Sequence, residues 1–204
     1  MRTILTSAVV AIIASVATHK GPALYDQLRT AISPPEKVAK ATQGKDFWQT
    51  PAIEGFGKIH YAEQMQYRPD PAQTYKVVFQ IQNSKEAKSD VNKELDKVAR
   101  TVNLYAASGV PLEQLQFVVA ISASATPVVL NNTHYRRNFG VDNPNLALID
   151  KLREAGVVVT VCDQAVAGHQ YAFDWVDKRV VHALSSLTTI TTLEHQGYVI
   201  MPNL

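Results

Sequence analysis

A run of β-branched residues at positions 157–161, followed directly by the chain's single cysteine, constrains the fold more than any other stretch. A continuous apolar run of this kind is typical of a strand buried on both faces, as in parallel sheets. Four further stretches have the composition of strands, at residues 75–81, 115–121, 180–184 and 198–201. Strands that alternate with helical segments predict a three-layer α/β fold, with a mainly parallel five-stranded sheet and helices on both faces.

Three helices are predicted between these strands from apolar residues at helical spacing and from capping residues. In the second helix, Asn143 is the expected cap and Pro144 the first helical residue. The expected limits are Ser89 or Asp90 to Gly109 for the first helix, Asn143 to Gly156 for the second, and Ser185 or Ser186 to Gly197 for the third.

Residues 1–17 have the pattern of a secretory signal peptide. Arg2 supplies a positive start, an apolar stretch follows, and the sequence from Ser15 to Ala17 fits the small-x-small cleavage pattern. The apolar stretch is shorter than the roughly 20 residues of a transmembrane helix, so we expect no stable membrane span after processing. An uncleaved anchor is the alternative. The mature protein is therefore predicted to be periplasmic or secreted.

The composition changes near residue 72. Residues 18–72 contain several prolines and glycines, with aromatic residues scattered among them without helical or strand period. We expect an N-terminal extension that packs its aromatic side chains onto the main domain, with a disordered tail as the alternative. Residues 73–204 are expected to form the α/β domain.

The carboxyl ends of the predicted parallel strands are the expected functional edge of the sheet. Right-handed crossovers bring these ends together, and ligands in open α/β sheets bind just beyond them. The residues expected to line a pocket around Cys162 at this edge are Asn83, Ser122, Ser124, Asp163 and Gln164.

Cys162 supports two interpretations, because a lone cysteine in an exported chain is either kept free for chemistry or buried and inert. A helix that starts near Gln164 would favour the thiolate, and His169 is a candidate partner for it. The carboxylate of Asp163 would disfavour the thiolate. The spacing of the histidines does not support a metal site with Cys162, so no metal is expected.

Several classes of function have no motif in this chain. No glycine-rich phosphate loop follows the first predicted strand, and no G-x-S-x-G elbow occurs. We therefore expect no nucleotide cofactor and no serine hydrolase chemistry. The formal net charge is +2, and the basic residues form no stripe, so nucleic acid is not an expected partner.

Much of the chain from about residue 75 resembles the DsrE/DsrF-like family of small α/β sulfur-relay proteins, in particular its YchN-like branch. The segments that carry the resemblance are residues 76–79, 143–157, 161–165, 185–187 and 193–198. The most specific parts are the Asn-Pro helix start and the Gln-Gly-Tyr ending.

The resemblance implies a fold, an assembly and an activity. It implies a five-stranded, mainly parallel sheet and a homotrimer or homohexamer. In sulfur-transferring members, a cysteine at the position of Cys162 accepts sulfane sulfur as a persulfide and passes it to a partner thiol. The expected function is therefore that of an exported sulfur carrier or sulfurtransferase, whose partners are a sulfur donor and acceptor. The alternative is a non-enzymatic homo-oligomeric binding or assembly protein, in which Cys162 is buried and structural.

Overall fold

The computed structural model describes residue 44, residues 47–86 and residues 88–201. Its helices and strands include the five strands and three helices that the sequence pattern indicates, in the expected order. They are β1 (Tyr75–Ile81), α3 (Lys93–Ala107), β2 (Leu115–Ile121), α4 (Asn132–Phe139), α5 (Leu146–Glu154), β3 (Val158–Cys162), α6 (Asp163–Gly168), β4 (Val181–Ala183), α7 (Ser186–His195) and β5 (Val199–Met201), with 3-10 turns at Leu112–Gln114, Ala123–Val129 and Phe173–Trp175.

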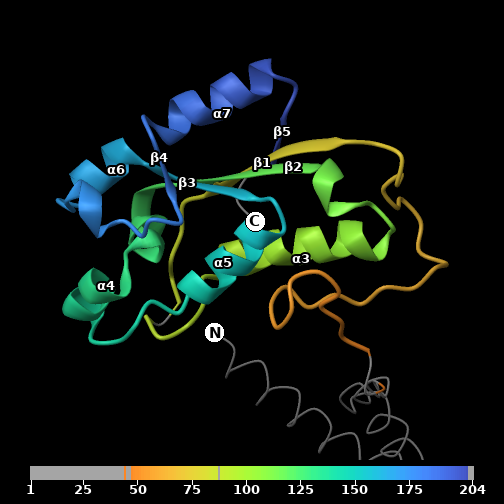
Figure 1. Ribbon diagram of the computed structural model, residues 1–204, viewed down its shortest axis with the longest axis horizontal. Helices are drawn as coiled ribbons and strands as arrows, with labels where there is room; N and C mark the ends of the chain where they lie inside the picture. The colour runs from red at the N-terminus through yellow and green to blue at the C-terminus, as the bar shows by residue number, and fades with distance from the viewer. Residues whose placement is uncertain (1–43, 45–46, 87, 202–204) are drawn as a thin grey trace, which may run out of the picture. The chain divides into compact units, whose positions relative to one another are not determined.

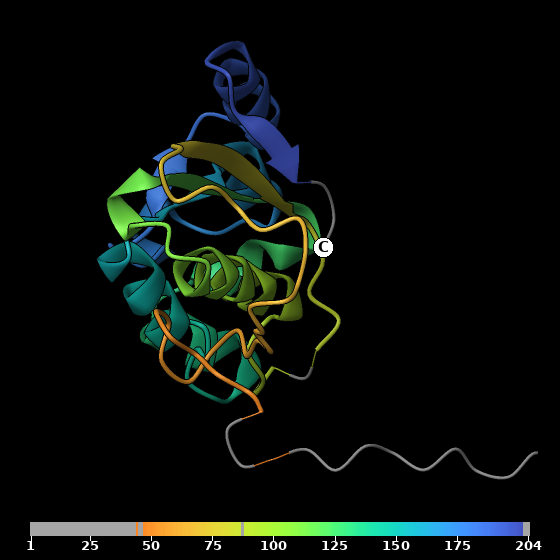
Figure 2. The same ribbon diagram turned by 90° about the vertical axis from the view of Figure 1, so that its right-hand side faces the viewer.

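The five strands form one sheet in the order β4-β3-β2-β1-β5, and every neighbouring pair is parallel. Helices α3 and α5 cover one face, and α7 lies on the other (Figure 1). The view turned by 90° shows the same three layers (Figure 2). The predicted three-layer α/β fold is confirmed, and the sheet is entirely parallel.

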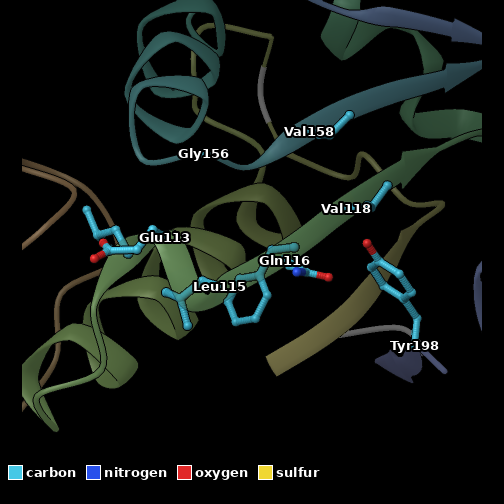
Figure 3. A pocket seen from close by; sticks show the side chains of 9 residues that line it. Glu113, Leu115, Gln116, Val118, Gly156, Val158 and Tyr198 are labelled. Carbon is cyan, nitrogen blue, oxygen red and sulfur yellow. The ribbon is translucent and has the colours of Figure 1, made fainter. Parts of the chain in front are cut away.

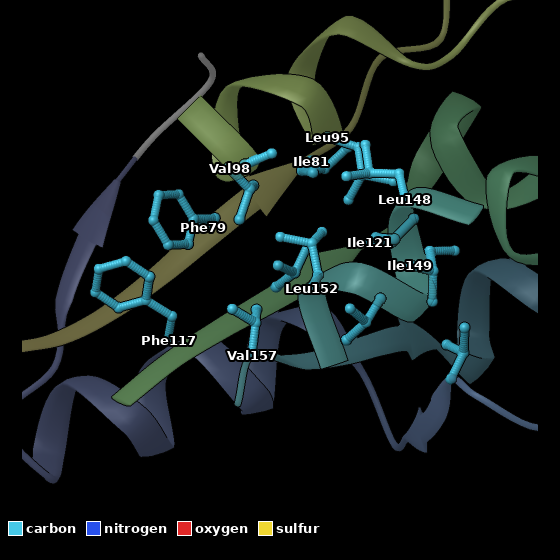
Figure 4. Packing of buried hydrophobic residues seen from close by; sticks show 14 of the residues in the cluster. Phe79, Ile81, Leu95, Val98, Phe117, Ile121, Leu148, Ile149, Leu152 and Val157 are labelled. Carbon is cyan, nitrogen blue, oxygen red and sulfur yellow. The ribbon is translucent and has the colours of Figure 1, made fainter. Parts of the chain in front are cut away.

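The main hydrophobic core lies between the sheet and helices α3 and α5 (Figure 4). Phe79 and Phe117, from neighbouring strands, pack edge to face with their ring centroids 5.2 Å apart. Leu95 of α3 and Leu152 of α5 are fully buried in the same cluster. Burial of each such side chain contributes about 1.5–3 kcal/mol, so this layer carries most of the hydrophobic stabilisation.

The opposite face of the sheet is covered only in part. Helix α7 contacts β1, β2 and β5, and Ile190 packs there against Val78 and Val118. Over β3 and β4 the same face is open in part, since Val158 is 45% exposed and Val181 is 52% exposed, whereas Thr160 and Cys162 of β3 are buried. This open half of the sheet includes β3, the strand that ends in Cys162.

The first helix begins later than expected. The side chain of Asn92 caps α3 by accepting the N–H of Leu95 at 2.9 Å. The predicted start at Ser89 or Asp90 is therefore wrong. Asn92 is favoured because it is buried, and its own N–H donates to the side chain of Asn145 at 2.7 Å. This contact joins parts of the chain that are far apart in sequence, so local spacing does not reveal it.

The second helix also differs from its prediction, because α5 begins two residues after Pro144. The Asn143 side chain accepts the N–H of Asn145 at 3.0 Å, one turn before the helix. Its amide group donates to the carbonyl oxygens of Val128 and Leu130. Asn143 thus fixes a turn against the preceding loop, and its predicted role as the cap of α5 is wrong.

Two helical segments between β2 and α5 were absent from the sequence prediction. The stretch Ala123–Val129 forms 3-10 turns, and α4 follows directly. Among the α4 residues only Tyr135 is buried. A helix with one buried side chain has almost no apolar periodicity, which explains why the pattern did not indicate it.

The segment that precedes β1 is attached to α3 by one buried amide. The side-chain oxygen of Asn103 accepts the N–H groups of Ala52 and Ile53 at 2.9 and 2.8 Å. Its amide nitrogen donates to the carbonyl oxygens of Phe56 and Gly57 at 2.9 and 3.0 Å. Because Asn103 is fully buried, these four hydrogen bonds satisfy all of its polar capacity in place of water.

The predicted extension at residues 18–72 can be followed from residue 47 onward. This part belongs to the same compact unit as the sheet, and Ile53 is fully buried in the main core. The predicted signal peptide at residues 1–17 lies outside the described residues. In the part of the chain that is described, no helix has both the length and the apolar character needed to cross a membrane.

A pair of glycine substitutions tests how the segment before β1 is attached to α3. A Cβ at Gly57 would lie 2.1 Å from the backbone nitrogen of Arg100, whereas a Cβ at Gly55 would meet nothing within 4 Å. Both glycines have positive φ, so Gly55→Ala carries only the conformational cost of about 1 kcal/mol. We expect Gly57→Ala to lower the free energy of unfolding by about 3 kcal/mol, because overpacking is added. Urea unfolding measures both values, and equal losses in the two variants would contradict the attachment.

Candidate functional site

Cys162 is the last residue of β3, between β2 and β4 in the sheet. It is buried, with 6% of its surface exposed. Its thiol donates a long hydrogen bond to the hydroxyl of Ser185, with 3.9 Å between Sγ and Oγ. The register explains this contact: Ala183 of β4 lies opposite Cys162, so the chain leaving β4 passes the thiol at once.

Two helices begin at the thiol. Cys162 occupies the N-cap position of α6, and Ser185 is the N-cap of α7, where its hydroxyl accepts the N–H of Leu187 at 3.2 Å. The prediction that Ser185 or Ser186 starts the third helix is confirmed. The first N–H groups of a helix have no partner inside it and carry partial positive charge. The sulfur therefore lies where two such ends converge.

The pKa of the Cys162 thiol is lowered by this setting. Burial raises the pKa, but the backbone N–H groups of Ser186 and Ala165, and the hydroxyls of Ser185 and Ser186, lower it by more. The groups responsible are uncharged donors, and no cationic side chain in the described residues contributes. The thiolate is favoured without a lysine or arginine.

Asp163, predicted to line the pocket, has its carboxylate directed at a histidine. Its Oδ1 lies 2.5 Å from Nδ1 of His182 on β4. The ring of His182 stacks on Phe173, with 3.5 Å between the ring centroids. Asp163 is not among the groups that shift the pKa of Cys162. The carboxylate next to the thiol is thus paired, and it does not oppose the thiolate as the sequence suggested.

Ser122 lies at the end of β2, the strand next to β3. It is buried, with 5% exposed, and its hydroxyl has no hydrogen-bond partner. Ser124, two residues further on, is exposed and donates to the carbonyl oxygen of Gln82 at 2.9 Å. Ser124 therefore ties the loop after β2 to the loop after β1.

The remaining predicted site residues contact other parts of the edge. The side-chain amide of Asn83 donates to Glu94 of α3 at 2.9 Å. Gln164 is exposed and donates to the carbonyl oxygen of Leu184 at 3.2 Å. His169 is exposed, and its Nε2 lies 2.8 Å from the carbonyl oxygen of Ala123. The role of His169 as a partner of the thiol stays a prediction.

Sequence reasoning missed the groups that act on the thiol most directly. Ser185 and Ser186 were recognised only as helix caps, and no role was predicted for His182. What brings these three side chains to the site is the position of β4 beside β3, which leaves no mark in local spacing. The sequence did contain one signal: Ser185 and Ser186 come directly after the predicted strand at residues 180–184, and residues in that position lie at the carboxyl edge of a parallel sheet.

A separate pocket of about 260 Å³ opens at the other end of the strands (Figure 3). Gln116 and Val118 of β2, Val158 of β3 and the ring of Tyr198 line it, on the face that carries α7. Gln116 and Val158 are at the amino ends of β2 and β3, so this pocket is distinct from the carboxyl edge with Cys162.

Among the residues that the structure describes, no group of three or more histidine, cysteine, aspartate or glutamate side chains is placed to hold a metal ion.

No family model matches the sequence, and no characterised protein matches it. A solved structure from Methanobacterium thermoautotrophicum, the protein of unknown function MTH1491, is similar with a TM-score of 0.47 and 19% identity. The match covers 63% of this chain and 99% of that chain.

The lowered pKa of Cys162 predicts how stability depends on pH. The unfolded chain, with the higher pKa, binds the thiol proton more tightly, so stability rises with pH between the lowered pKa and about 8.5, and is constant above. The gain relative to Cys162→Ser is about 1.4 kcal/mol for each unit between the two pKa values. Urea unfolding of both proteins from pH 6 to pH 9 measures it. A stability difference that does not change with pH would contradict the assignment.

Proposed function

We propose that this chain handles reduced sulfur, with Cys162 accepting sulfane sulfur as a persulfide and passing it on. The observation that carries the proposal is the thiol at the carboxyl edge of a parallel sheet, with its pKa lowered by N–H and O–H donors at two helix starts. Reactive cysteines have such settings, because the thiolate is the nucleophile. The resemblance to the DsrE/DsrF-like family, YchN-like branch, points to the same chemistry.

The proposed reaction is an exchange between sulfur atoms. The Cys162 thiolate attacks the outer sulfur of a donor persulfide, a new S–S bond forms, and the donor's S–S bond breaks. The electron pair leaves with the donor sulfur, which takes up the proton and departs as a thiol. Attack by an acceptor thiolate on the same outer sulfur returns Cys162 to its starting form. No outside oxidant or reductant is needed.

The sulfur donor and acceptor are proposed to be met outside the cytoplasm. The signal-peptide pattern of residues 1–17 supports this proposal, since such a pattern is typical of chains exported to the periplasm or the medium. The donor is a small sulfur compound or another protein. A single cysteine suits a carrier in an oxidising compartment, because the chain has no second thiol with which to close an internal disulfide.

We also propose that copies of the chain associate through the open half of the sheet. Val158 and Val181 are exposed there, and Leu184 and Leu187, where the chain passes from β4 into α7, are 71% and 73% exposed. We call these four residues the apolar patch. Contiguous exposed apolar side chains mark interaction surfaces in soluble proteins. Self-association through the apolar patch would place the second copy next to Ser185 and the thiol.

A second candidate function rests on the burial of Cys162. With 6% of the residue exposed, the sulfur has little direct contact with solvent. In this alternative the cysteine is structural, and the protein is a homo-oligomeric binding or assembly protein. Alkylation of the native chain distinguishes the two functions. A thiol that reacts only after denaturation supports the structural role.

The sulfur proposal predicts a mass change on one residue. After exposure of the mature protein to inorganic polysulfide, followed by removal of the excess, we expect intact-protein mass spectrometry to show one added sulfur atom. Peptide mapping should place it on Cys162, because that is the sole thiol of the chain. Cys162→Ser is the control. A serine variant that gains the same mass would exclude Cys162 as the site.

The association proposal predicts a change of mass in solution. A lysine at the apolar patch would bury a charge at the interface between copies, which is strongly unfavourable. We expect Leu187→Lys to convert the assembly to the monomer in sedimentation equilibrium. Leu104→Lys is the matched control, since Leu104 is a 40% exposed leucine on α3, on the opposite face of the sheet. Equal effects of the two variants, or none, would contradict the proposed surface.

A further inference from the structure

Ser122 has an unusual hydroxyl. In the described part of the chain, it is the one fully buried side-chain oxygen or nitrogen atom without a hydrogen-bond partner. Buried polar groups are nearly always paired, because a hydroxyl removed from water without a partner destabilises the fold. An alanine at this position would avoid that cost. The hydroxyl is therefore a candidate for a contact that forms only when a ligand is present.

The register places Ser122 beside Cys162. Ile121 and Val161 are paired across β2 and β3, and both are buried in the main core under α5. One residue further, the alternation of a strand turns the next side chain of each to the opposite face. Ser122 keeps an extended backbone, with φ −157° and ψ −175°, so the alternation holds. Neighbouring strands are about 4.8 Å apart, so Ser122 and Cys162 are adjacent positions on the α7 side, and no hydrogen bond joins the hydroxyl to the thiol.

We propose that the Ser122 hydroxyl donates a hydrogen bond to the outer sulfur of the persulfide on Cys162. The inference rests on the proposed function and adds a positioning residue to it. The inner sulfur keeps the donors of Ser185, Ser186 and Ala165. The outer sulfur is about 2 Å further out and carries the negative charge after transfer. An unpaired hydroxyl on the adjacent strand is the donor that this charge lacks.

The same geometry limits the class of sulfur donor. The groups that favour the thiolate are uncharged, and no described cationic side chain adds to them. The site thus suits a single negative charge spread over two sulfur atoms, as in a persulfide. The transfer stays balanced: the thiolate displaces the donor's thiolate from the outer sulfur, and the serine proton is shared without leaving its oxygen.

Two variants with opposite expected effects on the melting temperature test the role of Ser122. Ser122→Ala removes the unpaired hydroxyl, so we expect its melting temperature to equal or exceed that of the wild type. Thr160→Val is the control, since Thr160 is a buried hydroxyl two residues before Cys162 and donates to the carbonyl oxygen of Val119 at 2.9 Å. We expect this variant to melt at a lower temperature, because it loses a made hydrogen bond.

The functional readout is the lifetime of the added sulfur. Each protein is loaded with inorganic polysulfide, desalted, given an excess of a small thiol as sulfur acceptor, and followed by mass spectrometry over time. A hydrogen bond to a charged group corresponds to about tenfold or more in an equilibrium, so we expect Ser122→Ala to lose its sulfur at least about ten times faster than the wild type. Thr160→Val should keep it as long as the wild type does.

The outcomes separate this inference from the proposed function. A wild-type chain that gains no sulfur on Cys162 overturns both. A wild type that gains sulfur, together with a Ser122→Ala variant that keeps it equally long, overturns the role of Ser122 alone. A Ser122→Ala variant that melts at a clearly lower temperature also overturns this role, because the hydroxyl would then have a structural partner.

Discussion

The parallel pairing of β3 with β2 on one side and β4 on the other is the constraint on which the candidate site depends. It places Ser122, Cys162 and Ala183 in a row at one edge of the sheet. The chain then turns from β3 into α6 and from β4 into α7, so both helices start at the thiol. A different strand order would leave the same residues far apart. The chemistry of the edge therefore follows from the register.

Two opposing effects meet at the sulfur of Cys162. Burial in a sheet edge disfavours the thiolate, and the donors at the helix starts favour it. The donors prevail, which is the condition for a nucleophilic thiol at neutral pH. The neighbouring carboxylate of Asp163 is engaged by His182, so the nearest negative charge has its own partner. The site thus combines low exposure with a stabilised anion.

The sequence allowed the fold class and the strand positions to be predicted, because β-branched runs such as residues 157–161 depend on local composition. The residues at which the helices begin were harder to predict. Asn92 caps α3 by accepting the N–H of Leu95, and its own N–H is held by the side chain of Asn145, a long-range contact that overrides the local caps at Ser89 and Asp90. Helix α4 buries one residue and leaves no periodic signal.

The sequence allowed the site to be placed at the carboxyl edge of the sheet, but it did not allow the contacts of the thiol to be predicted. The position of Cys162 at a strand end follows from composition, and Ser122 was expected nearby. The roles of Ser185 and His182 depend on β4 lying beside β3, and strand order leaves no trace in local spacing. The most direct test of the account is the ultraviolet thiolate absorbance of the native protein, measured against Cys162→Ser across pH. We predict a lower midpoint for Cys162 in the native protein than in the urea-unfolded protein, and a native midpoint equal to or above the unfolded one would contradict the account.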